Sequence, residues 1–391
     1  MSKLEQLINE LCPEGVEYIR LKECTEMKRG TSATKKTLSE GQIPVISGGK
    51  EPAFYCDTAN RYGETITIAG SGAGAGYVQY WNEPIFLNDA FSIKGSKNLN
   101  TRYLYHYLLN IQEKIYDTKK RGGVPHVHIS SIENFLVPTP PLPVQEEIVR
   151  ILDKFTELTT ELTTELTTRK QQYEYYREQL FIFGDEVEWK SLKELLQPKG
   201  YIRGPFGSAL KKDFFVNEGV PIYEQQHAIY NKRDFRYYID NNRAEKLKRF
   251  MVKPYDLIIS CSGTIGKISI ITPQDRKGII NQALLILRLD LTKVKITYIK
   301  YYLECFTNLI VTSSGGAITN IEKREIIEKI KIPVPPLEEQ QRLVDILDRF
   351  DKLCNDISDG LPAEIEARQK QYEYYRDKLL TFKKKEATEN E

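Results

Sequence analysis

The sequence lacks the short motifs that mark a self-contained enzyme. It contains no [DNS]PP[YFW] methyl-transfer motif, no Gly-Lys-Ser or Gly-Lys-Thr nucleotide loop, no HExxH and no GxSxG. Each of these would supply a catalytic group or a cofactor site. Their absence favours a protein that recognises something over one that catalyses a reaction.

Cysteine, methionine and long apolar runs are also scarce. The six cysteines are scattered without a CxxC pair, and there are three methionines. This usage is typical of reduced structural thiols in a cytosolic protein. No run approaches the ~20 apolar residues of a membrane helix, and the first residues lack the core of a signal peptide. We therefore expect a cytoplasmic protein that makes no contact with a membrane.

Excess charge of one sign is missing as well. The 56 Lys and Arg residues nearly balance the 54 Asp and Glu residues, and the net charge is +2. Composition as a whole therefore does not predict a nucleic-acid partner, and a polyanion could bind only to local basic surfaces.

The sequence does contain an internal repeat. RKQQYEYYREQLFIF (169–183) recurs as RQKQYEYYRDKLLTF (368–382), with nine of fifteen positions identical. VPTPPLPVQEEIVRILDKF (137–155) recurs as IPVPPLEEQQRLVDILDRF (332–350), with ten of nineteen identical. The period is far longer than a solenoid unit. The repeat therefore predicts two copies of a module in which a globular body is followed by a long helix.

Each body is dominated by short β-branched or alternating runs between Gly, Pro and Asn, such as 64–70, 76–81, 255–263, 266–272 and 283–289. These runs predict strands, with one helix in each body at 102–116 and 297–311, where Tyr103 and Tyr107 correspond to Tyr298 and Tyr302. The fold class is mixed α/β (α+β), with two pseudo-symmetric bodies separated by a pair of long antiparallel helices. The expected segments are an N-terminal helix (1–14), the first body (15–138), the first helical spacer (139–184), the second body (185–333), the second spacer (334–383) and a charged tail (384–391).

Past the prolines at 139–143 and 334–338 the apolar period becomes helical. A helix of ~40 residues cannot bury such a stripe alone, so the two spacers should pack as an antiparallel coiled coil. The second helix should break at Gly360 and Pro362. We expect the contacts of the helix pair, or of subunits bound to it, to come from Leu152, Phe155, Leu162, Tyr173, Tyr176, Leu180, Leu347, Phe350, Tyr372, Tyr375 and Leu379.

The first spacer contains TELTTELTTELTT (156–168), a four-residue unit repeated three times. Threonine is only a moderate helix former. Two interpretations stay open: a solvated helix face whose leucines keep the stripe, or a spacer whose length sets a distance.

Two features suggest cofactor sites but lack essential parts of such sites. The glycines of AGSGAGAG (69–76) are followed by an alternating strand, whereas a dinucleotide or P-loop site opens a helix. A tight hairpin is the better interpretation. His126 and His128 could ligate a metal, but no nearby Cys or acidic residue completes a set, so no metal site is expected.

Basic side chains interleaved with aromatic ones indicate where DNA could bind. Arg, Gln and His are residue types that contact base edges and phosphates. The candidates are Arg29, Lys35, Lys36, Lys119, Lys120, Arg121 and His126 in the first body, and Arg203, Lys211, Lys212, Gln225, Gln226, His227 and Arg233 in the second.

The duplicated body, the [VI]PxPPLxxQ closure with Gln145 and Gln340, the QYEYYR helix ends and the opening EGVEY together resemble the specificity subunit of type I restriction–modification systems. The resemblance covers essentially the whole chain. It implies two target-recognition domains that each read half of a split, asymmetric DNA site. It also implies helices that dock two methyltransferase subunits and, in the full complex, restriction subunits. S-adenosylmethionine, ATP and Mg²⁺ would then be bound by those partners and not by this chain.

Two other interpretations remain: a methyltransferase or nuclease with fused recognition domains, and a protein scaffold that does not bind DNA. The missing catalytic motifs disfavour the first. Salt-dependent DNA binding would separate the second from the rest.

Overall fold

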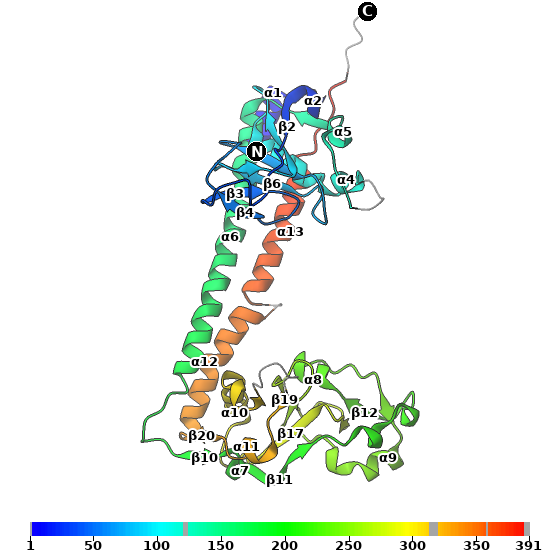
Figure 1. Ribbon diagram of the computed structural model, residues 1–391, viewed down its shortest axis with the longest axis vertical. Helices are drawn as coiled ribbons and strands as arrows, with labels where there is room; N and C mark the ends of the chain where they lie inside the picture. The colour runs from blue at the N-terminus through cyan, green and yellow to red at the C-terminus, as the bar shows by residue number, and fades with distance from the viewer. Residues whose placement is uncertain (1, 120–123, 313–319, 357–358, 387–391) are drawn as a thin grey trace, which may run out of the picture. The chain divides into compact units, whose positions relative to one another are not determined.

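The computed structural model describes residues 2–119, 124–312, 320–356 and 359–386 and divides into two compact units (Figure 1). Unit 1 comprises residues 1–165 and 363–391, and unit 2 comprises residues 166–362. Both are mixed α/β, as the sequence predicts. Within the described ranges, no helix has the length and apolarity that crossing a membrane requires.

Unit 1 contains three sheets. A four-stranded antiparallel sheet has the order β2-β8-β5-β6, a three-stranded sheet the order β4-β3-β7, and a two-stranded ladder joins β1 to β9. β3 and β7 pair in parallel. The strands are β1 (Glu17–Arg20), β2 (Thr25–Arg29), β3 (Ile43–Ile46), β4 (Phe54–Cys56), β5 (Thr65–Ala69), β6 (Val78–Trp81), β7 (Phe86–Leu87), β8 (Ala90–Gly95) and β9 (Leu136–Thr139).

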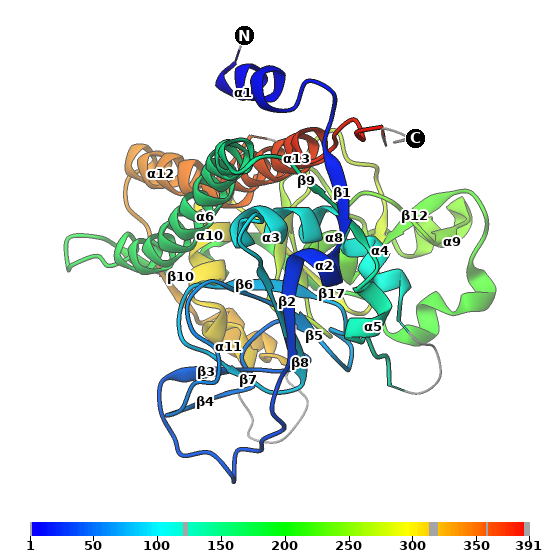
Figure 2. The ribbon, with the colours of Figure 1, turned by 90° about the horizontal axis from the view of Figure 1, so that it is seen from above.

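Helices cover the four-stranded sheet of unit 1. Tyr103, Leu104 and Leu108 of α3 lie in the same buried cluster as sheet residues such as Ile66 and Ile93, and Figure 2 shows α3 alongside the sheet. The helices are α1 (Lys3–Leu11), α2 (Leu21–Cys24), α3 (Thr101–Asn110), α4 (Gln112–Asp117), α5 (Ile129–Ile132), the first part of α6 (Leu142–Gln179) and most of α13 (Leu361–Leu379).

Unit 2 repeats this plan. Its four-stranded sheet has the order β11-β17-β14-β15, its three-stranded sheet the order β13-β12-β16 with β12 and β16 parallel, and β10 pairs with β20. The strands are β10 (Trp189–Ser191), β11 (Leu196–Arg203), β12 (Val220–Tyr223), β13 (Tyr238–Ile239), β14 (Asp256–Ser260), β15 (Ile268–Ile270), β16 (Ile279–Ile280), β17 (Leu284–Leu289), β18 (Val311–Thr312), β19 (Asn320–Ile321) and β20 (Lys331–Pro333).

The helices of unit 2 also follow the order of unit 1, with two additions, α8 and α9. They are the last part of α6, α7 (Leu192–Leu195), α8 (Gln225–Ile229), α9 (Asn241–Lys246), α10 (Ile296–Cys305), α11 (Arg324–Ile327) and α12 (Leu337–Asn355). The predicted hairpins of both bodies are present, because β5 pairs antiparallel with β6 and β14 with β15.

The two predicted helical spacers are confirmed. The first is one helix of 38 residues, α6, and the second is interrupted between Asn355 and Leu361. In unit 1, α6 packs antiparallel to α13, with the Phe155 ring 5.3 Å from that of Tyr375. In unit 2, the end of α6 packs on α12, with the Tyr173 ring 6.0 Å from that of Phe350.

The two predicted body helices are partly wrong in extent. The first is divided into α3 and α4 at Ile111. The second ends at Cys305, six residues early, and the chain then turns through Thr307–Leu309 into β18. There the chain leaves the α-helical conformation at Phe306, whose φ and ψ are −106° and 48°.

A buried glutamine joins each long helix to its own body. The Gln145 side chain has no exposed surface; its Oε1 accepts from the Asn100 N–H at 2.8 Å and its Nε2 donates to the Pro140 carbonyl at 2.6 Å. In unit 2, Gln340 makes the same two bonds, from the Lys295 N–H at 2.8 Å and to the Pro335 carbonyl at 2.8 Å. The glutamine of the repeated closure therefore fixes the helix start against the body.

Repeated tyrosines reinforce this junction. The hydroxyls of Tyr103 and Tyr298 donate to the carbonyls of Pro138 and Pro333, at 3.0 and 2.9 Å. One turn later, Tyr107 and Tyr302 donate to carbonyls of β9 and β20. The prediction that these tyrosines correspond is thus confirmed by identical bonding.

The N-terminal helix packs against the far end of the second long helix. Leu4 of α1 and Leu380 lie in one buried cluster. The Val16 N–H donates to the Lys383 carbonyl at 2.9 Å, and the Tyr18 hydroxyl donates to the Phe382 carbonyl at 2.9 Å. The start of the chain is therefore held on the segment that follows α13 by both apolar and polar contacts.

Replacing the buried glutamine should destabilise unit 1. Gln145→Leu leaves a buried N–H and two carbonyls without partners, since Nε2 also bonds the Asn98 carbonyl at 3.0 Å. The free energy of unfolding should fall by about 3 kcal/mol. The matched control is Gln341→Leu, because Gln341 is exposed and bonds only Asp345 in the described contacts. Equal urea midpoints for the two variants would refute the proposed role of the glutamine.

Unit 1 also contains a buried histidine at the junction between body and helices. His106 is fully buried, with Nε2 2.8 Å from an Asp153 oxygen and Nδ1 2.9 Å from the Tyr372 hydroxyl. Burial lowers the pKa of His106, and the bond with Asp153 opposes this only in part. The folded protein therefore holds this imidazole neutral more firmly than the unfolded chain does.

This lowered pKa predicts a loss of stability on acidification. Below about pH 6.5 the unfolded chain binds a proton at His106 that the folded state resists, so the free energy of unfolding should fall from there toward pH 5. His106→Gln should reduce that slope in urea titrations at several pH values. Asp153, whose pKa is also lowered, would change the free energy of unfolding only below about pH 4. An unchanged slope in the variant would contradict the assignment.

Candidate nucleic-acid interface

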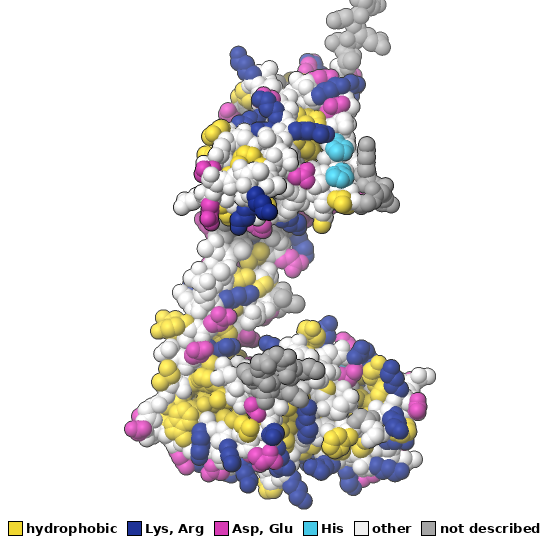
Figure 3. All heavy atoms as spheres, viewed as in Figure 1, with side chains coloured by type: hydrophobic (Ala, Val, Ile, Leu, Met, Phe, Trp, Pro, Cys, Tyr) yellow, Lys and Arg dark blue, Asp and Glu magenta, His cyan; other side chains and the backbone are white. Residues whose placement is uncertain are grey.

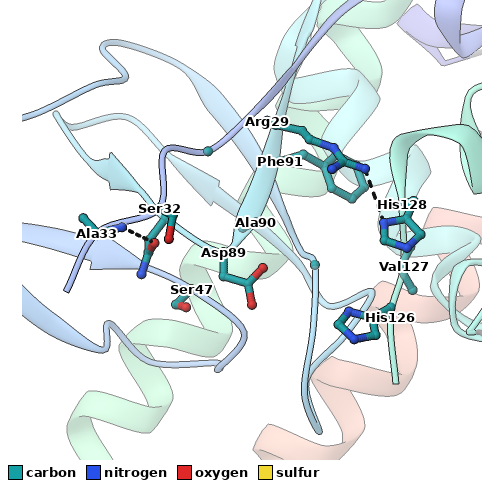
Figure 4. Close-up of a pocket in the computed structure, with 13 residues that line it drawn as sticks. Arg29, Ser32, Ala33, Ser47, Asp89, Ala90, Phe91, His126, Val127 and His128 are labelled. Carbon is teal, nitrogen blue, oxygen red and sulfur yellow. Dashed lines mark hydrogen bonds between the residues drawn. The ribbon is translucent and has the colours of Figure 1, made fainter. Parts of the chain in front are cut away.

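Four loops of unit 1 meet at one end of its sheets. They follow β2, β3, β5 and β7; β2 and β5 both run antiparallel to β8, and β3 runs parallel to β7. The loops and the segment 126–128 enclose a cavity of about 600 Å³ (Figure 4). Its lining consists of Arg29, Gly30, Ser32, Ala33, Ser47, Gly70, Asn88, Asp89, Ala90, Phe91, His126, Val127 and His128.

The cavity is lined by hydrogen-bond donors and acceptors. Figure 4 shows Arg29 reaching toward His128, and its guanidinium lies 3.4 Å from the Nδ1 atom. The rings of His126 and His128 are parallel, with centroids 5.9 Å apart. The Asp89 carboxylate accepts a hydrogen bond from the Ser71 hydroxyl. Such a mixture of groups suits a ligand with both donors and acceptors, such as a base edge.

Unit 2 places an arginine at the matching position. Arg203 ends β11 and pairs with Leu285 of β17, and Arg29 ends β2 and pairs with Phe91 of β8, one residue nearer to the matched asparagine. The next residue is glycine in both units. A Cβ on Gly30 would lie 2.0 Å from the Asn88 carbonyl oxygen, and one on Gly204 would lie 1.8 Å from that of Asn281. Only glycine fits where the two loops cross.

The loops around these arginines also correspond. The backbone N–H of Asn88 donates to the Ile46 carbonyl at 2.8 Å, and that of Asn281 donates to the Tyr223 carbonyl at 2.9 Å. After β5 and β14, Ser71-Gly72 corresponds to Ser262-Gly263, and both glycines have positive φ, +81° and +68°. These glycines form hairpin turns and open no helix, as the sequence predicts.

The matched loops carry different side chains at other positions. Ile46 and Tyr223 hold equivalent positions, so two residues later Gly48 of unit 1 corresponds to Gln225 of unit 2. The Gln225 Nε2 donates to the Ser262 hydroxyl at 2.8 Å. Asp89 is replaced by Gln282, and both are exposed. The two units thus share one frame, that is, the same strand order and loop backbone, but present different hydrogen-bonding groups on it.

The predicted residues of unit 1 do not all meet at this cavity. Arg29 and His126 line it, and Lys35 lines a neighbouring cavity of about 650 Å³. Lys36 is exposed, and the Lys119 ammonium lies 3.9 Å from the centre of the Tyr116 ring. Lys120 and Arg121 lie outside the described residues.

In unit 2, Arg203 and Gln225 lie at the matched site, and Lys211 and Lys212 are exposed on the segment after it. Lys and Arg side chains are frequent on the face of unit 2 shown in Figure 3. Gln226 is partly exposed, with its Nε2 3.5 Å from the Asp234 carbonyl.

Two predicted residues of unit 2 face inward. His227 is fully buried between Glu224 and Asp234, and burial lowers its pKa. The Arg233 guanidinium bonds Asp275 at 2.8 Å and the Ser269 hydroxyl at 3.0 Å. These side chains stabilise the loop after α8 and are not offered to a ligand.

Sequence reasoning missed the residues between β7 and β8 and between β16 and β17: Asn88 and Asp89, and Asn281 and Gln282. A signal was present, because FLNDA (86–90) and IINQA (279–283) recur in the two bodies. Within the described residues, no group of three or more His, Cys, Asp or Glu side chains is placed to hold a metal.

Most of the residues expected at the helix pair are buried or lie against the core of their own unit. Leu152 and Leu347 are buried, Leu162 is nearly so, and Leu180, Tyr372 and Leu379 pack on the cores of their own units. Tyr176 and Tyr375 remain substantially exposed, as do their neighbours Tyr175 and Tyr374.

Comparison with known proteins decides the family. The family model described as "Type I restriction modification DNA specificity domain" matches residues 13–169 and 186–367. The chain belongs to this family. It is 30% identical to the Type I restriction enzyme EcoR124I/EcoR124II specificity subunit of Escherichia coli, over 100% of this chain and 99% of the relative.

Further relatives agree with this assignment. A protein of Haemophilus influenzae, named as a putative type I restriction enzyme specificity subunit, is 33% identical over 88% of this chain and 89% of its own length. The crystal structure of a type I restriction–modification S subunit from M. genitalium has the same fold, with a TM-score of 0.58 and 16% identity, over 94% of this chain and 96% of that chain. Family membership favours a specificity subunit over the alternatives of a fused enzyme or a scaffold that does not bind DNA.

Proposed function

We propose that this chain reads a bipartite DNA sequence, one half through each unit, as the specificity subunit of a type I restriction–modification complex. The observation that carries the proposal is the matched Arg-Gly and Asn arrangement at the same sheet ends of unit 1 and unit 2. Two copies of one frame suit two half-sites on one duplex.

The residue types at the two sites fit this role. Arginine bonds the O6 and N7 atoms of guanine, and glutamine bonds the N6 and N7 atoms of adenine, in the major groove. The exposed lysines beside them, Lys35 and Lys36 in unit 1 and Lys211 and Lys212 in unit 2, are suited to phosphates, which carry most of the affinity.

The unmatched positions explain why the two halves would differ. Asp89 can only accept hydrogen bonds when ionised, whereas Gln282 both donates and accepts. Gly48 offers no side chain, whereas Gln225 offers an amide. Because the two units share a frame but differ in their loop side chains, the DNA site that they read would be asymmetric.

The partner subunits would bind to the long helices α6 and α13. Large aromatic side chains at a surface are typical anchors of interfaces, and Tyr175 and Tyr374 are each more than half exposed. We propose that two methyltransferase subunits, and restriction subunits in the full complex, dock on this surface in the cytoplasm. S-adenosylmethionine, ATP and Mg²⁺ would be bound by those subunits, and this chain would catalyse no step.

Exchange of one body tests the modular assignment. Residues 196–323, from the start of β11 to the residue before α11, are replaced with those of a different family member. This exchange leaves the β10–β20 ladder and Gln340 in place. With its methyltransferase partner, the exchanged chain should methylate sites in which one half is new and the other unchanged. Sequencing of methylated DNA gives the result, and a change in both halves would disprove the assignment of one half-site to each unit.

Deletion of one TELT unit tests the spacer. Removing residues 160–163 shortens α6 by ~6 Å and rotates the remainder of the helix by about 40°, because a helix rises ~1.5 Å and turns ~100° per residue. DNA advances ~3.4 Å per base pair, so the unspecified spacer of the methylated site should shorten by at most roughly two base pairs.

Both half-sites should keep their sequence in that deletion. The matched control inserts one TELT unit, which should lengthen the spacer by the same amount. An unchanged spacer in both variants would reduce the tract to an ordinary helix face, and loss of a half-site would assign the tract to recognition.

A further inference from the structure

Phe206 presents an aromatic ring to solvent beside the matched site of unit 2. It is 89% exposed, the largest value among the exposed large hydrophobic side chains of the described residues. It lies two residues after Gly204, within roughly 7 Å of extended chain. In unit 1 the same count from Gly30 reaches Ser32, a polar side chain that lines the cavity.

The backbone around Phe206 is anchored on both sides. The Gly204 N–H donates to the Leu284 carbonyl at 2.9 Å, and Pro205 is buried. The Phe206 carbonyl accepts from the Ala209 N–H at 2.9 Å, and Leu210 is buried in a cluster with Ile222 and Ile239. The ring is therefore held outward by a structured segment, which lowers the entropy cost of a contact.

The segment that carries the ring also carries cations. Arg203 precedes Phe206 at the end of β11, and the exposed Lys211 and Lys212 follow it. Among the described residues, no carboxylate lies within ion-pairing distance of either lysine. An apolar ring on a segment with unpaired lysines suits a polyanion that also offers an apolar group, and an apolar protein surface would leave these cations unmatched.

We propose that Phe206 contacts the C5-methyl group of a thymine in the half-site read by unit 2. This inference rests on the proposed reading of DNA and names a determinant of its specificity. Arg203, Gln225 and Gln282 are residue types that read the major groove, and there the thymine methyl is the apolar group that a base pair offers. Because unit 1 has Ser32 at this position, its half-site lacks the contact.

Uracil substitution tests the contact, because uracil differs from thymine only by the missing methyl. Once the site has been mapped and its halves assigned, binding of the chain with its methyltransferase partner is measured on duplexes with one thymine replaced at a time. At one position of the unit 2 half-site, the wild type should lose about 3- to 10-fold in affinity.

Phe206→Ala should bind thymine-containing DNA as weakly as the wild type binds the uracil duplex, and should not distinguish the two. Phe206→Leu should keep part of the preference for thymine. The matched control is Tyr230→Ala, another exposed aromatic of unit 2 at 68% exposure, which should keep the full preference. Because these side chains are exposed, the variants should melt like the wild type.

Three results would overturn the inference while the proposed function stands: a unit 2 half-site without thymine, equal losses for Phe206→Ala on thymine and uracil duplexes, or wild-type affinity of that variant. Absence of any sequence-specific site would overturn the proposed function itself, and the inference with it.

Discussion

The arrangement of each unit depends on one buried glutamine. Gln145 and Gln340 sit at the start of a long helix, and each bonds the N–H before a body helix and a carbonyl of the proline turn. A buried amide without partners is costly, so the three segments can adopt few relative positions that satisfy it. The body sheet is thereby held on the helix, and the loops of the candidate site lie at fixed ends of that sheet. Those loops are therefore positioned within each unit by a residue that lies at the helix junction.

This constraint explains why the loops can differ between the units while the frame does not. The strand order, the parallel pair of short strands and the glycine at each loop crossing are the same in both. The side chains at the loop tips differ, as with Asp89 and Gln282, because none of the frame contacts passes through them. A fold of this kind permits a new half-site to arise by loop substitution without loss of the junction to the helices.

Much of the fold could be predicted from the sequence, because its signals are local. The helical stripe predicted α6 and the break before α13, and the alternating runs predicted both hairpins. The parallel pairing of β3 with β7 could not be predicted, since it joins residues 41 apart in sequence through two residue pairs. For the candidate site, residue type singled out Arg29, Arg203 and Gln225, and their contact with DNA stays a prediction. It could not tell that His227 and Arg233 face inward, because their direction is set by α8 and the loop after it. Sequence alone also could not show that Phe206 is exposed, because its exposure depends on the buried Pro205 and Leu210.

The threonine tract of α6 has a physical explanation in its hydroxyl groups. Thr156, Thr159, Thr160 and Thr164 each donate to a carbonyl three or four residues earlier, so their oxygens are satisfied within the helix. The tract therefore needs few outside partners. Its neighbours are anchored separately, by Phe155 on Tyr375 in unit 1 and by Tyr173 on Phe350 in unit 2. A segment that satisfies its own polar groups between two anchored ends can vary in length by whole repeats, because each repeat supplies its own leucine to the apolar stripe, as the buried Leu162 does.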